Sequence, residues 1–380
     1  MNELGLYIHI PFCAKKCYYC DFISYAQKQD KIEEYCDSLI KEIEQESKNI
    51  NKEDVVTTIY IGGGTPSFVD AKYITKIVET IKNNYMVEEN AEITIEVNPG
   101  TVDESKLNEY KKCGINRLSI GLQSTKSELL KEIGRIHTYE EFLNCYNSAR
   151  NVGFNNVNID LMLGLPNQTM QDMEESLKKV ISLSPEHISL YSLIVEENTP
   201  IEKMLQEGVL KLPPEELERE MYWKTKEILE KNNYKHYEIS NFAKEGYESK
   251  HNSNCWKQKE YLGFGVAAHS YYESKRYCNT NSIEEYCENI EDNNFKNNRT
   301  IFEEQSQDEK QKEFMMLGLR MLEGVDIQEF KKKFVNNPIY IFHGELEKLI
   351  NEDLLEIDLN KIRLTNNGLD FANLVWEEFV

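Results

Sequence analysis

The stretch Leu4-Gly-Leu-Tyr-Ile-His-Ile10-Pro-Phe-Cys13-Ala-Lys-Lys-Cys17-Tyr-Tyr-Cys20 decides the fold. Its first seven residues are mostly apolar, which predicts a buried strand, and the strand ends at Pro11. Three cysteines then follow with the spacing C-x3-C-x2-C. The segment therefore predicts a strand that carries a group of thiols into the loop at its carboxyl end.

Strand and helix patterns alternate from this segment as far as residue 232. A helical pattern covers residues 31–46, and further strands are predicted over 55–61, 91–97, 117–120, 157–163 and 187–193. Strands that alternate with helices favour a parallel sheet, wound open or closed into a barrel. Polar motifs stand where these strands end, which is the edge at which parallel α/β folds bind their ligands.

We divide the chain into four parts. Residues 1–232 form the predicted α/β domain, and residues 233–287 hold aromatic and polar segments that would cap it. Residues 288–311 are rich in Asn, Glu, Lys and Gln, a composition typical of a linker. Over 312–380, helical patterns surround a short Asp-Leu-Asn-Lys hairpin, which predicts a small helical domain of the winged-helix type.

The composition is that of a folded cytoplasmic protein. The 380 residues suffice for two or three domains, and 40% are apolar. The formal net charge of −22 argues against a nucleic-acid binder. No apolar stretch is long enough for a transmembrane helix, and the N-terminus does not resemble a signal peptide. Nine cysteines in so long a chain favour reduced thiols over a disulfide framework.

Three closely spaced cysteines suit an iron–sulfur cluster. In a [4Fe–4S] cluster, three protein ligands leave one iron open to a small molecule. Two other interpretations remain. A zinc site would need a fourth ligand such as His9, and Cys17 with Cys20 would form a redox pair. The other six cysteines share no spacing, and we expect most of them to pack as small apolar residues.

The segment from Tyr7 to Cys20 resembles the radical S-adenosylmethionine (SAM) superfamily. Within it, the chain is similar to oxygen-independent coproporphyrinogen III oxidases and their haem-chaperone relatives. The resemblance spans nearly the whole chain. It implies a partial (β/α)6 barrel, a [4Fe–4S] cluster held by Cys13, Cys17 and Cys20, and SAM bound to the open iron. One electron from the cluster would cleave SAM into methionine and a 5′-deoxyadenosyl radical.

The same resemblance implies a set of SAM-binding residues at the strand ends. The glycines at 62–64 would hold the amino group, Glu96 the ribose, and Arg135 the carboxylate, because a guanidinium pairs with a carboxylate through two hydrogen bonds. Taken alone, each residue is better explained as a turn, a surface or capping residue, or ordinary packing than as a ligand. Their order along the chain favours a ligand site. The full predicted set is Tyr7, Tyr19, Gly63, Gly64, Thr65, Glu96, Gln123, Arg135, Asp160 and Ile194.

The two branches of the resembled family differ at points that this sequence allows us to compare. The oxidases have a fourth cysteine two residues after the third, where this chain has Phe22. They also have an N-terminal extension, whereas only six residues precede Tyr7 here. The chaperones carry a His-Asn-x-x-Tyr-Trp motif, which resembles His251-Asn-Ser-Asn-Cys255-Trp256 with cysteine in place of tyrosine. These features favour a haem chaperone over an oxidase that decarboxylates porphyrinogen propionates.

Imidazole and thiolate groups both ligate haem iron. We therefore predict that His251 binds haem, that Cys255 supplies or tunes a ligand, and that Trp256 stacks on the porphyrin. The alternative is a structural histidine that hydrogen-bonds a loop near the barrel mouth. His269 would either pack in the core or line the SAM or porphyrin cavity.

The expected partners are haem, carried as cargo, haem-acceptor proteins, and an electron donor. Because the chain is strongly acidic, a basic docking face is expected on any protein partner. A zinc-binding interaction protein with a degenerate barrel is the third interpretation of the sequence.

Overall fold

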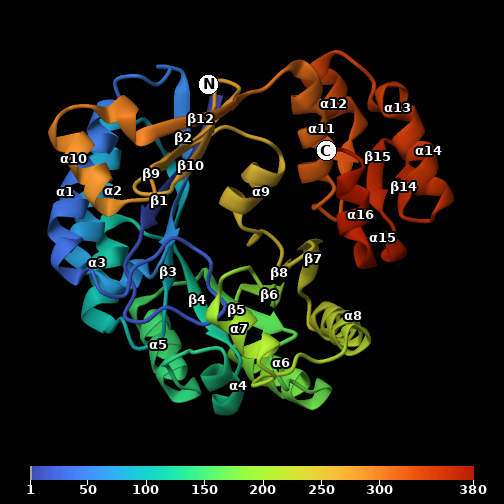
Figure 1. Ribbon diagram of the computed structural model, residues 1–380, viewed down its shortest axis with the longest axis horizontal. Helices are drawn as coiled ribbons and strands as arrows, with labels where there is room; N and C mark the ends of the chain where they lie inside the picture. Colours follow the sequence, from blue (N-terminus) through green and yellow to red (C-terminus); the bar gives the residue numbers. More distant parts are fainter. Residues whose placement is uncertain (1) are drawn as a thin grey trace.

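The computed structural model describes residues 2–380, apart from the side chains of residues 302 and 303. Its centre is a sheet in which six strands run parallel and pair in chain order (Figure 1). These strands are β1 (Asn2–Ile10), β2 (Asp54–Gly63), β3 (Val87–Val97), β4 (Arg117–Gln123), β5 (Val157–Leu163) and β6 (His187–Ser192). The parallel α/β architecture predicted from the alternating pattern is confirmed, as an open sheet that does not close into a barrel.

The outer face of these strands is apolar and packs against helices. In β1, for example, Leu4, Leu6, Ile8 and Ile10 are at most 1% exposed. Burying side chains of this size stabilises each strand by about 1.5–3 kcal/mol per residue. The covering helices are α1 (Ile32–Glu46), α2 (Ala71–Asn84), α3 (Glu104–Cys113), α5 (Tyr139–Val152), α6 (Met170–Leu183) and α8 (Glu215–Lys231).

The other face of the six strands carries polar and ionisable side chains. A sheet that served only as a core would not bury such groups, so this face and its carboxyl edge are where a ligand site is expected. The side chains include Tyr60, Glu96, Arg117, Asn158, Asp160 and His187.

Residues after α8 extend the sheet at both edges. On the β6 side lie β8 (Asn241–Ala243) and β7 (Lys235–Glu238), both in antiparallel pairs. On the β1 side, β9 (Tyr261–Phe264) adds in parallel and is followed by β10 (His269–Tyr272) and β11 (Lys275–Asn279). Between these two groups, α9 (Lys250–Trp256) lies against the inner face of the sheet near β2 (Figure 1).

The stretch 288–311 differs from the linker that its composition indicated. It contains the end of α10 (Ile283–Glu291), a short 3-10 helix at Phe295–Asn298, and β12 (Arg299–Glu304), which pairs with β11 as an edge strand. Arg299 also forms an ion pair of 2.9 Å with Glu46 of α1. An edge strand is bonded on one side only and faces water on the other, which explains its polar composition.

The C-terminal part forms a second hydrophobic core around a three-stranded sheet. Its strands, in the order β13 (Val325–Asp326), β15 (Lys361–Leu364) and β14 (Leu355–Asp358), are antiparallel. Six helices surround them, as expected for the winged-helix type of domain. They are α11 (Gln307–Gly318), α12 (Ile327–Phe334), α13 (Pro338–Ile341), α14 (His343–Asn351), α15 (Asn366–Asp370) and α16 (Ala372–Glu377).

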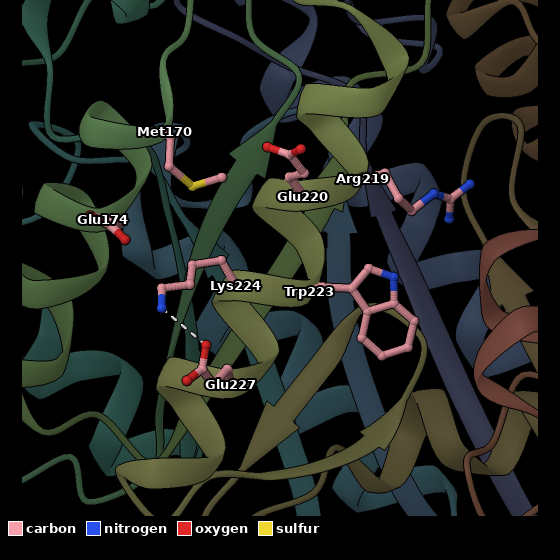
Figure 2. A pocket seen from close by; sticks show the side chains of 7 residues that line it. All are labelled: Met170, Glu174, Arg219, Glu220, Trp223, Lys224 and Glu227. Atoms are coloured by element: carbon pink, nitrogen blue, oxygen red, sulfur yellow. Dashed lines mark hydrogen bonds and ion pairs between the residues drawn. The ribbon is translucent and has the colours of Figure 1, made fainter.

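Helix α8 connects the two cores. Its Trp223 and Arg219 side chains both bond to Asp370 of α15, at 2.8 and 2.9 Å. Beside them lies a pocket of about 500 Å³ between α6 and α8, in which Lys224 already pairs with Glu227 (Figure 2). This pocket is formed by helices that cover the outer face of the sheet, so it is separate from the polar inner face.

Candidate functional site

The three cysteines lie in the loop after β1, and the loop is held by main-chain hydrogen bonds. Cys13 and Tyr25 pair across it, with the Cys13 amide 3.0 Å from the Tyr25 carbonyl. The Tyr18 amide donates to the Ile133 carbonyl, which ties the loop to the end of α4 (Ser127–Glu132). Cys13 is nearly buried, and its sulfur accepts a hydrogen bond from the Thr65 hydroxyl at 3.6 Å.

The electrostatics of the loop favour occupation by a cation. Burial raises the pKa of the Cys13 and Cys20 thiols, and the mutual repulsion of the thiolates raises it further. The positive charge of Lys16 lowers the pKa of both thiols. Because iron binds the thiolate form, a bound metal centre would supply the positive charge that this buried loop needs.

His9 is already fully used as a hydrogen-bonding residue. Its Nε2 donates to the Ile23 carbonyl, so its Nδ1 is the acceptor for the Tyr7 hydroxyl, both at 2.9 Å. Burial lowers the pKa of His9 to about 4. The fourth ligand considered for a zinc site is therefore engaged elsewhere.

The donor set fits a cluster better than a single ion. Within residues 2–380, no three His, Cys, Asp or Glu side chains converge as the ligands of one metal ion would. A [4Fe–4S] cluster makes a different demand, since each cysteine binds a different iron. The three cysteines share one loop, and Cys17 is near enough to raise the pKa of both Cys13 and Cys20.

The glycines at the end of β2 allow the close approach that the site requires. A Cβ atom on Gly64 would lie 3.0 Å from the Cys13 sulfur and 2.9 Å from the Phe12 carbonyl oxygen. Gly63 has a φ of 112°, and its amide donates to Glu96 at 3.2 Å. Only glycine leaves this main chain open to a ligand beside the cysteine loop.

Glu96 is the penultimate residue of β3, and its carboxylate accepts hydrogen bonds from residues of β2. The Tyr60 hydroxyl donates to it at 2.9 Å, in addition to the Gly63 amide. Burial, together with the nearby charge of Asp160, raises the pKa of Glu96 to about 7. The carboxylate is thus enclosed but retains oxygen lone pairs for the hydroxyl groups of a ligand.

Arg135 has the free hydrogen-bonding capacity that a carboxylate ligand needs. One terminal nitrogen donates to Asn98 at 2.9 Å, whereas its buried Nε has no partner. Burial lowers the pKa of Arg135, but the nearby charges of Tyr19, Cys17 and Asp160 outweigh this effect and raise the pKa. Arg135 is the residue that the sequence analysis expected to pair with the carboxylate of SAM.

Asn98 is a site residue that the sequence analysis missed. It accepts from Arg135 and donates to the Thr65 hydroxyl at 2.8 Å, and that hydroxyl donates in turn to the Cys13 sulfur. A continuous chain thereby joins Arg135 to a cysteine of the loop. The signal was present, because Asn98 stands directly after a predicted strand, where polar residues of parallel sheets gather.

The remaining predicted SAM residues are near the same edge of the sheet. Asp160 accepts from Asn158 at 2.6 Å, and burial raises its pKa. Gln123 ends β4 with a φ of 67°, and its amide adjoins Gly121 together with Arg135 and Asn98. Ile194, in the loop after β6, is 67% exposed.

The structure gives His251 a structural environment. It is 6% exposed, its Nδ1 lies 2.9 Å from the Thr58 hydroxyl, and its ring stacks on Tyr60 with centroids 5.3 Å apart. Burial raises the pKa of Cys255 to about 12, so its thiol is protonated near neutral pH. His269 is exposed on β10, so it is not a core residue.

Trp256 contacts the C-terminal domain. The guanidinium of Arg320 lies over its ring at 4.3 Å and over Trp376 at 4.9 Å. Arg320 also pairs with the buried carboxylate of Glu238 at 2.9 Å. In this structure, stacking on Trp256 is provided by the arginine.

Comparison with known proteins agrees with this geometry. Residues 7–180 match the family model of the Radical SAM superfamily, and residues 305–371 match that of the HemN C-terminal domain. The solved structure of the Escherichia coli coproporphyrinogen III oxidase (HemN) superposes with a TM-score of 0.85, over 100% of this chain and 90% of that one, at 24% identity. The fold and the site thus define a radical SAM protein.

Relatives that match nearly the full length of the chain identify its family within this superfamily. The heme chaperone HemW of Lactococcus lactis subsp. lactis is 36% identical over 98% of this chain and 96% of the relative. That of Bacillus subtilis is 36% identical over 98% of both. The chain belongs to the HemW family of radical SAM proteins. Membership of the superfamily implies a [4Fe–4S] cluster and SAM, and the residues described above fit both. Over residues 2–380, no helix has the length and apolarity needed to cross a membrane.

Proposed function

We propose that this protein binds haem and delivers it to acceptor proteins, and that it carries a [4Fe–4S] cluster and SAM. The observation that carries this proposal is the match over almost the entire chain to proteins named heme chaperones. Phe22 supports it, because it replaces the fourth cysteine of the oxidases and is 64% exposed beside the cysteine loop. The likeness to the solved oxidase concerns the fold.

Different residues would bind the [4Fe–4S] cluster and SAM. Cys13, Cys17 and Cys20 bind the cluster, which supplies a low-potential electron when bound. Around it, the glycine segment opens the main chain, Arg135 pairs with a carboxylate, and Glu96 accepts from hydroxyl groups. The remaining proposed SAM contacts are Tyr7, Tyr19, Thr65, Gln123, Asp160 and Ile194.

His251 and Cys255 are the proposed haem contacts. The Nδ1 of His251 is occupied by Thr58, and its Nε2 makes no hydrogen bond within the described part of the chain. Because His251 is 6% exposed and packed against β2, we propose that ligation of iron moves α9 away from that strand. In this proposal, haem binding breaks the contacts of His251 with Thr58 and Tyr60.

A haem-transfer assay tests the proposal. The protein is reconstituted anaerobically, loaded with haemin, and mixed with an apo-haemoprotein while spectra are recorded. We expect transfer of haem, and no protoporphyrinogen when the same preparation receives SAM, a reductant and coproporphyrinogen III. Many turnovers in the second assay would show an oxidase instead, and absence of haem binding would refute the chaperone function.

His251→Ala tests the proposed contact, with the exposed His343→Ala as the matched control. The first variant is expected to lower haem affinity and change the spectrum, and the second to leave both unchanged. Unchanged haem affinity in His251→Ala would remove His251 from the site.

A further inference from the structure

A chain of four hydrogen bonds leads from Asp160 to the beginning of α9. Asn158 Nδ2 lies 2.6 Å from Asp160 Oδ1, and Asn158 Oδ1 lies 2.6 Å from His187 Nδ1. His187 Nε2 lies 2.8 Å from the Tyr237 hydroxyl, which is 3.1 Å from the Ser249 amide. The path thus joins three strands, β5, β6 and β7, to the loop that precedes α9.

The polarity of this path follows from the chemistry of its members. The Asn158 carbonyl oxygen can only accept, so His187 carries its proton on Nδ1. The Nε2 of the neutral ring is then an acceptor, and the Tyr237 hydroxyl must donate to it. The Tyr237 oxygen is left to accept from the Ser249 amide. Every donor in the path points toward Asp160.

The path is shielded from water. His187 and Ser249 are 0% exposed, Asn158 is 2% exposed and Tyr237 is 5% exposed. Burial and the charge of Arg117 lower the pKa of His187 well below its usual range, which keeps the ring neutral. In such surroundings hydrogen bonds polarise one another, and an unmade bond is costly, so a change at one end affects the other.

The path ends where α9 starts. Ser249 is the N-cap residue of α9, and its hydroxyl accepts from the Asn252 amide. His251 therefore lies two residues from the amide that Tyr237 holds. The same first turn is held by the Glu92 carboxylate, which accepts from the Lys250 and His251 amides. Loss of the Tyr237 bond would therefore loosen the first turn of the helix that carries the proposed haem ligand.

A second connection reaches the same helix from Glu96. The Tyr60 hydroxyl donates to Glu96, and the Tyr60 ring stacks on the imidazole of His251. The two carboxylates that we propose for SAM, Asp160 and Glu96, thus each lead to α9.

We propose that His187 and Tyr237 are positioning residues through which SAM binding and haem binding oppose each other. This inference rests on the proposed function. The positive charge of bound SAM favours the ionised form of Asp160, which is the stronger acceptor for the Asn158 amide and therefore strengthens the path. An intact path adds to the bonds from Thr58 and Glu92 that hold α9 against the sheet, whereas in this proposal haem ligation by His251 moves α9. SAM consequently lowers the affinity for haem.

Two ligand titrations test this inference. Haemin affinity is measured with and without SAM on the reconstituted protein, without reductant so that SAM stays intact. In the wild type, SAM is expected to weaken haem binding by about fivefold or more, and haem to weaken SAM binding by the same factor. In Tyr237→Phe, each ligand is expected to change the affinity of the other by less than about twofold.

The matched control is Tyr234→Phe. Tyr234 is as well buried as Tyr237, but its hydroxyl donates to the Pro185 carbonyl outside the path. It should therefore keep the full coupling. A merely structural effect of losing a buried hydroxyl would appear in both variants.

Two substitutions of His187 give a second test that holds even if Tyr237→Phe does not fold. In His187→Gln, the side-chain amide can donate to Asn158 and accept from Tyr237, so coupling is expected to persist. His187→Leu can do neither and should lose it. Folding of each variant is checked by circular dichroism and iron content.

The outcomes separate the two proposals. A wild-type protein that binds no haem refutes the proposed function itself. A protein that binds both ligands without mutual effect, or whose coupling is the same in wild type, Tyr237→Phe and His187→Leu, refutes the linkage and leaves the proposed function standing.

Discussion

Asn98 shows how one amide can serve two functional groups. It accepts from Arg135 and donates to Thr65, whose hydroxyl reaches the Cys13 sulfur. An asparagine side chain has both a donor and an acceptor, so no aliphatic residue can replace it here. Asn98 therefore orients the guanidinium proposed for SAM relative to the cluster loop.

We predict that Asn98→Ala weakens SAM binding about tenfold, because one hydrogen bond to a charged group stabilises by about 1.5 kcal/mol. Iron and sulfide content should change little. Equilibrium binding of SAM provides the measurement. The control is Asn108→Ala on the exposed face of α3, whose amide bonds only within its own helix. Equal SAM affinity in the two variants would contradict this role.

Glu96 makes the stability of the protein dependent on pH in a defined direction. Its pKa is raised from 4.5 to about 7, so the native carboxyl retains a proton that the unfolded chain has already released. Between these values the contribution of Glu96 to stability falls as the pH rises.

Glu96→Gln removes this ionisation. As the pH rises from about 5 to about 8, the wild type loses this contribution and the variant does not. The free energy of unfolding of the variant relative to the wild type should therefore increase by on the order of 2 kcal/mol. Urea unfolding curves at the two pH values measure the difference. A difference that is independent of pH, or that changes in the opposite direction, would show that Glu96 titrates normally.

At the scale of elements, the end of β2 and the loop after β1 are built against each other. The Gly64 amide donates to the Ile10 carbonyl and the Thr65 amide to the Phe12 carbonyl. The strand end thus continues the pairing of β1 and β2 into the cysteine loop. There is no room at this junction for any side chain at position 64.

Gly64→Ala should displace the cysteine loop and abolish cluster assembly, while costing about 1–3 kcal/mol of stability through overpacking. Iron analysis after reconstitution tests this. Gly344→Ala is the control, because its new methyl group would meet nothing within 4 Å in α14. It should leave the iron content unchanged. Normal iron content in Gly64→Ala would mean that the loop does not need this close approach.

At the scale of the whole molecule, Arg320 joins the two cores. It pairs with Glu238 of β7 and lies between Trp256 of α9 and Trp376 of α16. The Glu238 side chain is only 1% exposed, and Arg320 is its ion-pair partner. The position of the C-terminal domain is thereby tied to the helix that carries the proposed haem motif.

We predict that Arg320→Met lowers the free energy of unfolding by about 3 kcal/mol or more, because it leaves a buried carboxylate without its ion pair. Chemical denaturation followed by tryptophan fluorescence measures it. Arg363→Gln removes an exposed arginine that pairs with Glu356 in the same domain, and it should cost less than about 1 kcal/mol. Similar losses in both variants would show that the interface does not depend on Arg320.

The sequence by itself determined the parallel sheet, the cysteine loop and the family, because each is written in local patterns. Apolar periodicity sets β1 to β6, and the spacing of Cys13, Cys17 and Cys20 needs no distant contact to be recognised. Four of the other six cysteines are buried, as their lack of spacing indicated.

Only the tertiary structure decided how distant residues meet. Within the stretch 288–311, residues 299–304 became an edge strand because β11 was there to pair with them. His251 became a buried neighbour of Thr58, 193 positions away, and Arg320 became the partner of Glu238. Such contacts join residues that are far apart in the sequence. The tertiary fold brings them together, and local sequence patterns carry no information about which distant residues will meet.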